Sequence, residues 1–290
     1  MAQKSALKER PAAEGHTVQG TISYYKSAPE KPTFHAQEHA RDNWEPDIRT
    51  VTFHDARTWK TPPTLDREGV CIAPAPTAIK NFEDREEVGA KYKGELEEIL
   101  RSQLGGAKIA KIVAMRGGNM RFSPRTDRYK TGMNSQPAHF PHVDCTMRTA
   151  TGLVDHPRFG IKKEELKPGQ RLVGYNVWRV VSPPPQDWPL ATCDVRTLAW
   201  DDLVLADGVY DTGPEPWARG EAYLVKYNPA HKWIYFSNMR AGEAMVFRMY
   251  EDNDRGLPGA AHSAFENPEC PPDVPGRISV EARVYAIFDE

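Results

Sequence analysis

The protein has 290 residues, a formal net charge of −2 and 39% hydrophobic residues. This composition supports a packed core and excludes a wholly disordered chain. Because there is no basic excess to neutralise phosphates, we expect no nucleic-acid partner. The sequence contains neither an apolar run long enough for a membrane span nor the apolar stretch of a secretory signal. We therefore expect a cytoplasmic protein with reduced cysteines and no membrane partner, and the oligomeric state stays open.

The domain organisation follows from composition along the chain. Residues 1–20 are polar and charged, and we expect them to form a flexible tail. Residues 21–290 show neither an internal repeat nor a linker, so we expect one domain. Its helix-bearing part covers residues 21–120 and its core covers residues 121–290.

The helix-bearing part opens with short β-type patterns. Strands are expected at 21–25, 48–54 and 108–115, with an irregular surface segment at 26–48. One helix is predicted before the last of these strands. Asn81 can cap it, apolar residues recur at steps of three or four, and the pair Gly105-Gly106 ends it.

The core part is predicted to consist mainly of strands. They are expected at residues 170–181, 221–227, 233–237, 244–250 and 277–288, with turn residues between them. The 25 prolines and 21 glycines agree with many short strands joined by turns. The pattern predicts a mostly β fold with flanking helices, built on a β-sandwich or barrel.

A possible metal site begins at His142 and Asp144, which stand two positions apart in the sequence. Side chains at positions i and i+2 of a strand point the same way, so an imidazole and a carboxylate can converge on one point. They would supply two of the three ligands of the two-histidine, one-carboxylate triad of ferrous iron. The same pair also occurs by chance as a polar pair at a strand end.

His262 is the favoured third ligand, because Arg277 and Ser279 follow it at the start of the last predicted strand. A guanidinium fork and a hydroxyl on one face suit the distal carboxylate of 2-oxoglutarate. His231 is the competing candidate. It precedes a strand too, but no Ser or Thr stands two positions after Arg240, the next arginine along the chain.

These motifs resemble those of the hydroxylase/desaturase family of non-haem iron enzymes, which includes gibberellin desaturase-like proteins and a relative from the cephamycin pathway. The resemblance runs in order from about residue 50 to the C-terminus. It is carried by residues 55–57, 65–70, 142–144, 176–179, 189–194, 231–235, 261–265 and 277–283.

The resemblance implies a double-stranded β-helix core, which is a jelly roll or cupin-like fold. It also implies Fe(II), with 2-oxoglutarate and O2 as co-substrates. His142, Asp144 and His262 would bind the iron, and Arg277 with Ser279 would hold 2-oxoglutarate. No catalytic residue beyond the metal centre is expected.

Two stretches depart from the family pattern. Cys145-Thr146 follows the His-x-Asp motif directly, and the glycine-rich residues 115–121 precede it. The glycines are expected to loosen this wall of the site. Cys145 is expected to be a packing residue and not a nucleophile.

Four further residues are candidate substrate contacts. Asn176 lies on the long predicted strand, where a buried amide needs a hydrogen-bond partner; a structural bond to a neighbouring loop is the alternative. Arg179 takes the opposite face of the same strand. Arg121 precedes the iron motif and could grip an acidic substrate. Arg283 could bind a carboxylate or pair with Glu281 on the last strand.

The favoured function is an Fe(II)/2-oxoglutarate-dependent dioxygenase that acts on a small-molecule precursor of a secondary metabolite. Its outcome would be hydroxylation, desaturation or ring closure such as aziridine formation, coupled to conversion of 2-oxoglutarate to succinate. Two other classes stay open. The same three ligands suit zinc in a hydrolase or lyase, and a non-catalytic β-sandwich would bind a ligand without chemistry.

Overall fold

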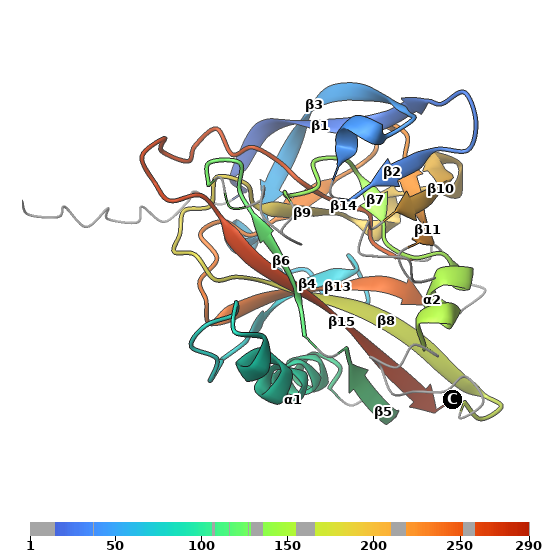
Figure 1. Ribbon diagram of the computed structural model, residues 1–290, viewed down its shortest axis with the longest axis vertical. Helices are drawn as coiled ribbons and strands as arrows, with labels where there is room; N and C mark the ends of the chain where they lie inside the picture. Colours follow the sequence, from blue (N-terminus) through green and yellow to red (C-terminus); the bar gives the residue numbers. More distant parts are fainter. Residues whose placement is uncertain are drawn as a thin grey trace, which may run out of the picture.

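Two β-sheets lie one above the other and form most of the molecule, as Figure 1 shows. The computed structural model describes residues 15–36, 38–105, 108–115, 117–126, 128, 136–154, 166–209, 219–251 and 259–289. The nine-stranded sheet contains, in spatial order, β1 (Thr17–Ser27), β3 (Glu45–Asp55), β12 (Trp233–Tyr235), β9 (Leu190–Cys193), β14 (His262–Ala264), β7 (His142–Val143), β11 (Arg219–Val225), β10 (Leu203–Val209) and β2 (Thr33–His35). The six-stranded sheet contains β4 (Val70–Pro74), β13 (Glu243–Glu251), β8 (Gln170–Val180), β15 (Ile278–Asp289) and β5 (Ile109–Ala114), with β6 (Asn119–Phe122) also paired to β15.

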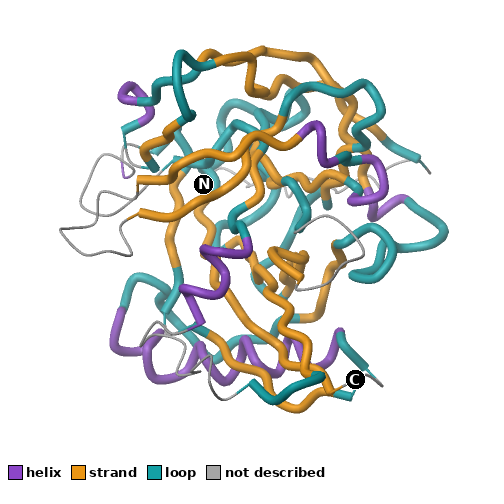
Figure 2. Tube along the Cα trace, turned by 90° about the vertical axis from the view of Figure 1, so that its right-hand side faces the viewer, coloured by secondary structure: helices purple, strands orange, loops and turns teal. Residues whose placement is uncertain are grey.

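The helices lie outside the two sheets. The longest helix, α1 (Arg85–Gln103), covers the outer face of the six-stranded sheet, and Figure 2 shows it running beneath the strands. A shorter helix, α2 (Met147–Val154), follows β7. Single 3-10 turns occupy η1 (His39–Arg41), η2 (Ala56–Thr58), η5 (Val195–Thr197) and η6 (Trp200–Asp202). No α-helix in the described ranges has the length and apolar character that a membrane span needs.

The predicted helix is confirmed, but it begins later than expected. Its N-cap is Asp84, whose carboxylate accepts hydrogen bonds from the backbone N–H groups of Glu86 and Glu87. Asn81 caps nothing in α1 and instead accepts a bond from the N–H of Glu83. The apolar face of α1 packs on the six-stranded sheet through buried residues Val88, Tyr92, Leu96, Ile99 and Leu100.

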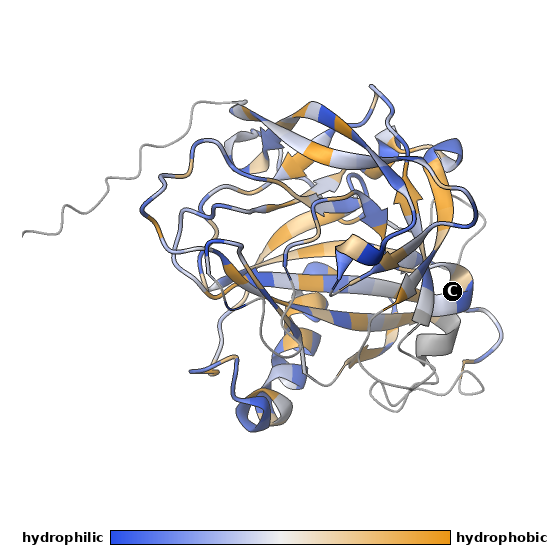
Figure 3. Ribbon diagram, turned by 45° about the horizontal axis from the view of Figure 1, so that its top comes forward, coloured by the Kyte–Doolittle hydropathy of each residue, from blue (hydrophilic) through white to orange (hydrophobic). Residues whose placement is uncertain are grey.

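The strands β8 and β15 form the centre of the six-stranded sheet and pair along their whole length. Their side chains alternate between two environments. One set, which includes Val177 and Val284, packs against α1, whereas the other faces the nine-stranded sheet and includes Asn176 and Ser279. Figure 3 shows hydrophobic and hydrophilic residues interspersed along these strands. The polar set is therefore enclosed between the sheets, where a site can form.

The N-terminal part differs from the sequence expectation in two places. Thr17–Gly20 belong to β1, so the expected tail does not extend to residue 20, and residues 1–14 lie outside the described ranges. The segment 26–48, expected to be irregular, contains β2, which pairs with β10 and buries Phe34. Three-residue strands such as β2 carry too few residues for an alternating pattern, and tertiary pairing decides their structure.

The glycine-rich stretch before β6 brings that strand close to its neighbour. A Cβ atom on Gly118 would lie 2.5 Å from Cγ2 of Val280 in β15, which is well inside the ~3.5–4.0 Å at which carbon atoms pack. The expectation that the glycines loosen this wall is therefore wrong at Gly118. Its missing side chain permits the β6–β15 pairing.

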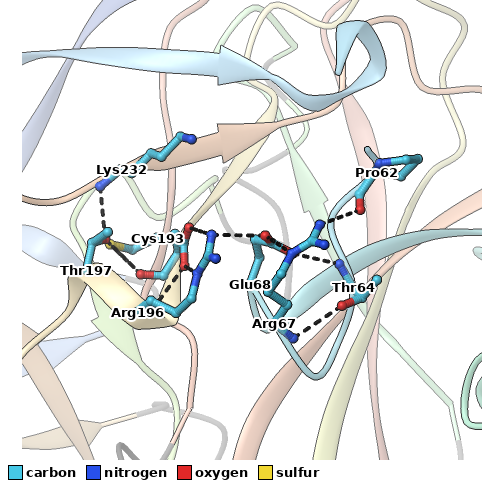
Figure 4. Close-up of polar contacts among 9 residues, drawn as sticks. Pro62, Thr64, Arg67, Glu68, Cys193, Arg196, Thr197 and Lys232 are labelled. Carbon is cyan, nitrogen blue, oxygen red and sulfur yellow. Dashed lines mark hydrogen bonds and ion pairs between the residues drawn. The ribbon is translucent and has the colours of Figure 1, made fainter. Parts of the chain in front are cut away.

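An ion network ties the loop before β4 to the turn after β9, as Figure 4 shows. The buried Glu68 carboxylate accepts hydrogen bonds from Arg67, from the backbone N–H of Thr64 at 2.9 Å, and from Arg196 at 3.0 Å. Arg196 also binds Asp194 at 2.6 Å. A buried carboxylate is destabilising without such partners. The network fixes the end of β9, the strand that pairs with β14 and so positions His262.

We predict that Gly69→Ala destabilises the protein by about 2 kcal/mol, since the left-handed backbone alone costs ~1–2 kcal/mol. Gly69 has φ +80°, and a Cβ atom there would lie 2.6 Å from Cγ1 of Val195. Urea unfolding measures the change. Gly89→Ala is the matched control, because Gly89 lies in α1 with open space around it. An equal effect of both substitutions would contradict the argument.

Candidate metal centre

Three side chains from distant parts of the sequence converge between the sheets. His142 and His262 are direct cross-strand partners on β7 and β14. Asp144 follows β7, and all three residues are buried. One ligand atom from each lies within 4.8 Å of the others. Nε2 of His142 lies 3.4 Å from Oδ1 of Asp144, and Nε2 of His262 lies 3.7 Å from the same oxygen.

Backbone carbonyls orient both imidazoles. Nδ1 of His142 lies 3.0 Å from the carbonyl oxygen of Phe140, and Nδ1 of His262 lies 3.3 Å from that of Ala260. A carbonyl oxygen only accepts hydrogen bonds, so Nδ1 carries the proton in each ring. Each Nε2 atom therefore presents a lone pair toward the point where the three side chains meet, as metal-binding histidines do.

The carboxylate of Asp144 is held from the opposite sheet. Nδ2 of Asn176 in β8 donates to Oδ2 at 2.6 Å, and Nη2 of Arg283 in β15 lies 3.7 Å from the same oxygen. Both partners contact Oδ2, which leaves Oδ1 toward the two histidines. The Asp144 carboxylate is therefore held in a fixed orientation, as the two imidazoles are.

Electrostatics favour the ligand forms of these groups. Burial lowers the pKa of the His262 imidazole to about 3, and the neighbouring His142 acts in the same direction. Burial opposes ionisation of Asp144, but its interactions with His262 and, next, with Arg283 hold the pKa of this carboxyl well below its ordinary value. A neutral imidazole and an ionised carboxylate are the forms that bind a metal ion.

An anion-binding end lies in the same space. Arg277 is 1% exposed, yet Nε and Nη2 of its guanidinium have no hydrogen-bond partner within the described chain, and Oγ of the fully buried Ser279 has none. The Arg277 guanidinium lies over the ring of Trp178, 5.4 Å from its centroid. Unpaired buried donors are costly, so these groups indicate a site for a carboxylate.

His142, His262 and Arg277 line one small cavity. The walls of the cavity include Arg121, Pro137, Ala138, His142, Trp178, Leu190, His262, Ala264, Arg277 and Glu281. A ligand that enters this cavity therefore meets Arg277 on one wall and two of the three converging residues on another.

The four residues predicted to contact substrate lie in three different environments. Arg121 lines the cavity. Asn176 and Arg283 contact Asp144, so they orient one of the three converging side chains. Arg179 lies on the other face of β8, against the rings of Phe82 and Tyr92, and donates to the carbonyl oxygen of Ala75. That position excludes it from the cavity, and the interpretation of Arg179 as a substrate contact is wrong.

His231 lies in a different cluster from the three converging residues. Its Nε2 atom is 3.1 Å from Asp202, and its Nδ1 atom is 3.2 Å from the hydroxyl of Tyr24. The imidazole stacks on Tyr24 and packs edge-on against Trp233. These contacts agree with the interpretation of His231 as a packed structural histidine.

Sequence reasoning missed two groups at the site. Glu281 lines the cavity, whereas the sequence suggested an ion pair with Arg283; alternation from Arg277 along β15 was the signal that could have placed it. Phe140 packs against His142 with ring centroids 5.0 Å apart, and Phe34 packs against Phe140. Neither phenylalanine lies in a pattern that indicates a site.

Comparisons with known proteins agree with this geometry. A family described as "Oxidoreductase/YMDC permease-like domain" matches residues 22–287. The Fe(II)/2-oxoglutarate-dependent dioxygenase nvfI of Aspergillus novofumigatus is 30% identical over 273 residues, which cover 90% of this chain and 88% of that protein. The protein belongs to the non-haem Fe(II)/2-oxoglutarate-dependent hydroxylase/desaturase family.

Other comparisons extend the likeness over the whole domain. The hydroxylase/desaturase efuI of Hormonema carpetanum is 24% identical over 309 residues, covering 96% of this chain and 98% of that protein. A solved structure of the iron and alpha-ketoglutarate-dependent endoperoxidase NvfI has a TM-score of 0.76 and 21% identity, and covers 94% of this chain and 99% of that chain. This structural likeness confirms the mostly β, jelly-roll fold.

The residues of this enzyme fit the cofactor and co-substrate of its family. Two neutral imidazoles and one carboxylate form the donor set of a ferrous site with open positions. The unpaired donors of Arg277 and Ser279 suit the distal carboxylate of 2-oxoglutarate. Zinc would accept the same three ligands, but it would not require the buried anion-binding end.

We predict that Asn176→Ala weakens metal binding by about 10- to 100-fold, because loss of a residue that orients a ligand has effects of this size. An anaerobic competition titration with Fe(II) measures the affinity. Asn228→Ala is the matched control, since Nδ2 of Asn228 also donates to a carboxylate, that of Asp202 at 3.1 Å. If both variants bind Fe(II) like the wild type, Asn176 does not position Asp144.

Proposed function

We propose that His142, Asp144 and His262 hold Fe(II), and that Arg277 and Ser279 hold the distal carboxylate of 2-oxoglutarate. The enzyme then oxidises a small molecule that is a precursor of a secondary metabolite. The observation that carries the proposal is that both histidines of a buried His-Asp-His cluster line the same cavity as Arg277, whose guanidinium has unpaired donors in the described chain. A zinc hydrolase or a binding module accounts for only one of these two features.

The residues around the proposed metal site each have a defined role. With iron, 2-oxoglutarate and O2 bound, the centre supplies an oxidant that removes hydrogen from a C–H bond, while 2-oxoglutarate becomes succinate and CO2. Phe140 and Ala260 fix the imidazole tautomers through their carbonyl groups. Asn176 and Arg283 fix the carboxylate of Asp144. The enclosing sheets keep water from the reacting groups.

The outcome of the reaction depends on where the substrate lies. A substrate carbon held near the metal can gain a hydroxyl group, lose a second hydrogen to give an alkene, or close a ring onto a nearby N or O atom. The walls that set this placement include Trp178, Leu190 and Ala264. They are apolar and mixed in size, which suits an organic scaffold more than a highly charged one.

The proposal predicts a weak visible absorption band when the metal-free protein is titrated anaerobically with Fe(II) and 2-oxoglutarate. Such a band arises when a keto acid chelates ferrous iron in a facial-triad site. We expect it in the wild type and in His231→Ala, and we expect its loss in His262→Ala. Circular dichroism checks that both variants are folded.

Two results would overturn the proposal. The first is the absence of the band at every ferrous loading of folded wild-type protein. The second is its loss in His231→Ala and survival in His262→Ala, which would assign the third ligand to His231. Zinc content of the purified protein then tests the hydrolase alternative.

A further inference from the structure

We infer that Arg121 is a second arginine of the co-substrate pocket, where it binds the distal carboxylate of 2-oxoglutarate together with Arg277 and Ser279. This inference rests on the proposed function and assigns Arg121 to the co-substrate in place of an acidic substrate. It makes Arg121 a residue that selects 2-oxo acids with two carboxylates over those with one.

Strand pairing places Arg121 beside the predicted anchor. Arg121 in β6 is the direct cross-strand partner of Ser279 in β15. Directly opposite residues of an antiparallel pair have Cβ atoms ~4.5–5.5 Å apart and share one face. Met120, the preceding residue, packs with Val280 on the outer face. Arg121 therefore points to the cavity side, and it lines the cavity together with Arg277.

The guanidinium of Arg121 keeps donors available on this side. The other residues of β6 carry no acidic side chain, and Nη1 of Arg121 donates to the carbonyl oxygen of Gln136 at 3.1 Å. Within the described chain, no carboxylate lies within ion-pair distance of Arg121. Glu281 is the acidic side chain in the same cavity wall, and no ion pair joins it to Arg121 among the described residues.

Arg121 and Arg277, two guanidinium groups that form no ion pair with another described residue, line the same cavity. Burial and, next, the charge of Arg121 lower the pKa of Arg277 to about 9, although the carboxylates of Asp187 and Glu281 act in the opposite direction. Like charges held together in a buried space are destabilising, and an anion between them removes that cost. The pair therefore indicates an anion with more than one acceptor atom.

A count of hydrogen bonds leaves room for Arg121. A carboxylate accepts about four hydrogen bonds. Nε and Nη2 of Arg277 and Oγ of Ser279 are three donor atoms without a partner in the described chain. Because a guanidinium fork presents one N–H from each of its two nitrogens to a carboxylate, these atoms supply three of the four bonds. Arg121, opposite Ser279, can supply the remaining donor. The three side chains together then satisfy one distal carboxylate.

Calorimetric titration of the Mn(II)-loaded protein under anaerobic conditions tests the inference. The ligands are 2-oxoglutarate and 2-oxobutanoate, which carries the same keto-acid end without the distal carboxylate. We expect Arg121→Gln to weaken 2-oxoglutarate binding about 10-fold or more, the size of one lost charge-assisted hydrogen bond. Binding of 2-oxobutanoate and of Mn(II) should change less than about 2-fold.

Three further variants make the result specific. Arg121→Lys keeps the charge but not the fork, so it should recover part of the affinity. Arg277→Gln should weaken 2-oxoglutarate binding at least as strongly as Arg121→Gln. Arg171→Gln, a partly exposed arginine of the same sheet that pairs with Glu251, should bind like the wild type.

The outcomes separate this inference from the proposed function. If the wild type does not bind 2-oxoglutarate, the proposed function fails. If the wild type binds it, Arg277→Gln loses it and Arg121→Gln matches the wild type, only the assignment of Arg121 fails. Equal losses of 2-oxoglutarate and Mn(II) binding in Arg121→Gln would also overturn the assignment, because they would indicate a general structural effect.

Discussion

One buried carboxylate joins the two sheets, and the site depends on it. Asp144 follows β7 in the nine-stranded sheet, whereas its partners Asn176 and Arg283 belong to β8 and β15 in the six-stranded sheet. Removing one partner of a buried ion pair costs roughly 3–5 kcal/mol. The same contacts therefore hold the two sheets together and orient Asp144 toward the histidines.

The strand β15 carries both chemical ends of the cavity. Arg277 and Ser279 at its beginning provide anion-binding donors, and Arg283 four residues after Ser279 contacts the metal-binding carboxylate. At ~3.3 Å per residue, Ser279 and Arg283 lie roughly 13 Å apart along the strand. The beginning of the strand therefore faces the anion-binding end, and its middle faces Asp144.

The sequence was sufficient to predict the elements that have a regular hydrophobic pattern and the residue pairs that have a recognisable chemical spacing. The stripe of α1, the alternation of β8 and β15, and the i, i+2 spacing of His142 and Asp144 all predict the observed elements. The third ligand needed the motif around Arg277 and Ser279, because no local pattern distinguishes His262 from His231. Short strands such as β2 and β7 have no pattern of their own, since pairing across the sheet creates them.

The role of a polar side chain depended on which face it takes. Asn176 and Arg179 stand three positions apart on β8, so they point to opposite faces, and the sequence identified that difference. It did not show that the outer face is filled by Phe82 and Tyr92 of the α1 region, which enclose Arg179. A buried arginine is therefore as compatible with an aromatic packing site as with a ligand site.

The position of Arg121 depends on a residue that has no side chain. Gly118 permits β6 to pair closely with β15, because a Cβ atom there would meet Val280. That pairing sets the register in which Arg121 stands opposite Ser279. A shift of one residue would turn Arg121 to the outer face beside α1. The close approach at Gly118 is thus compatible with the register that turns Arg121 toward the cavity.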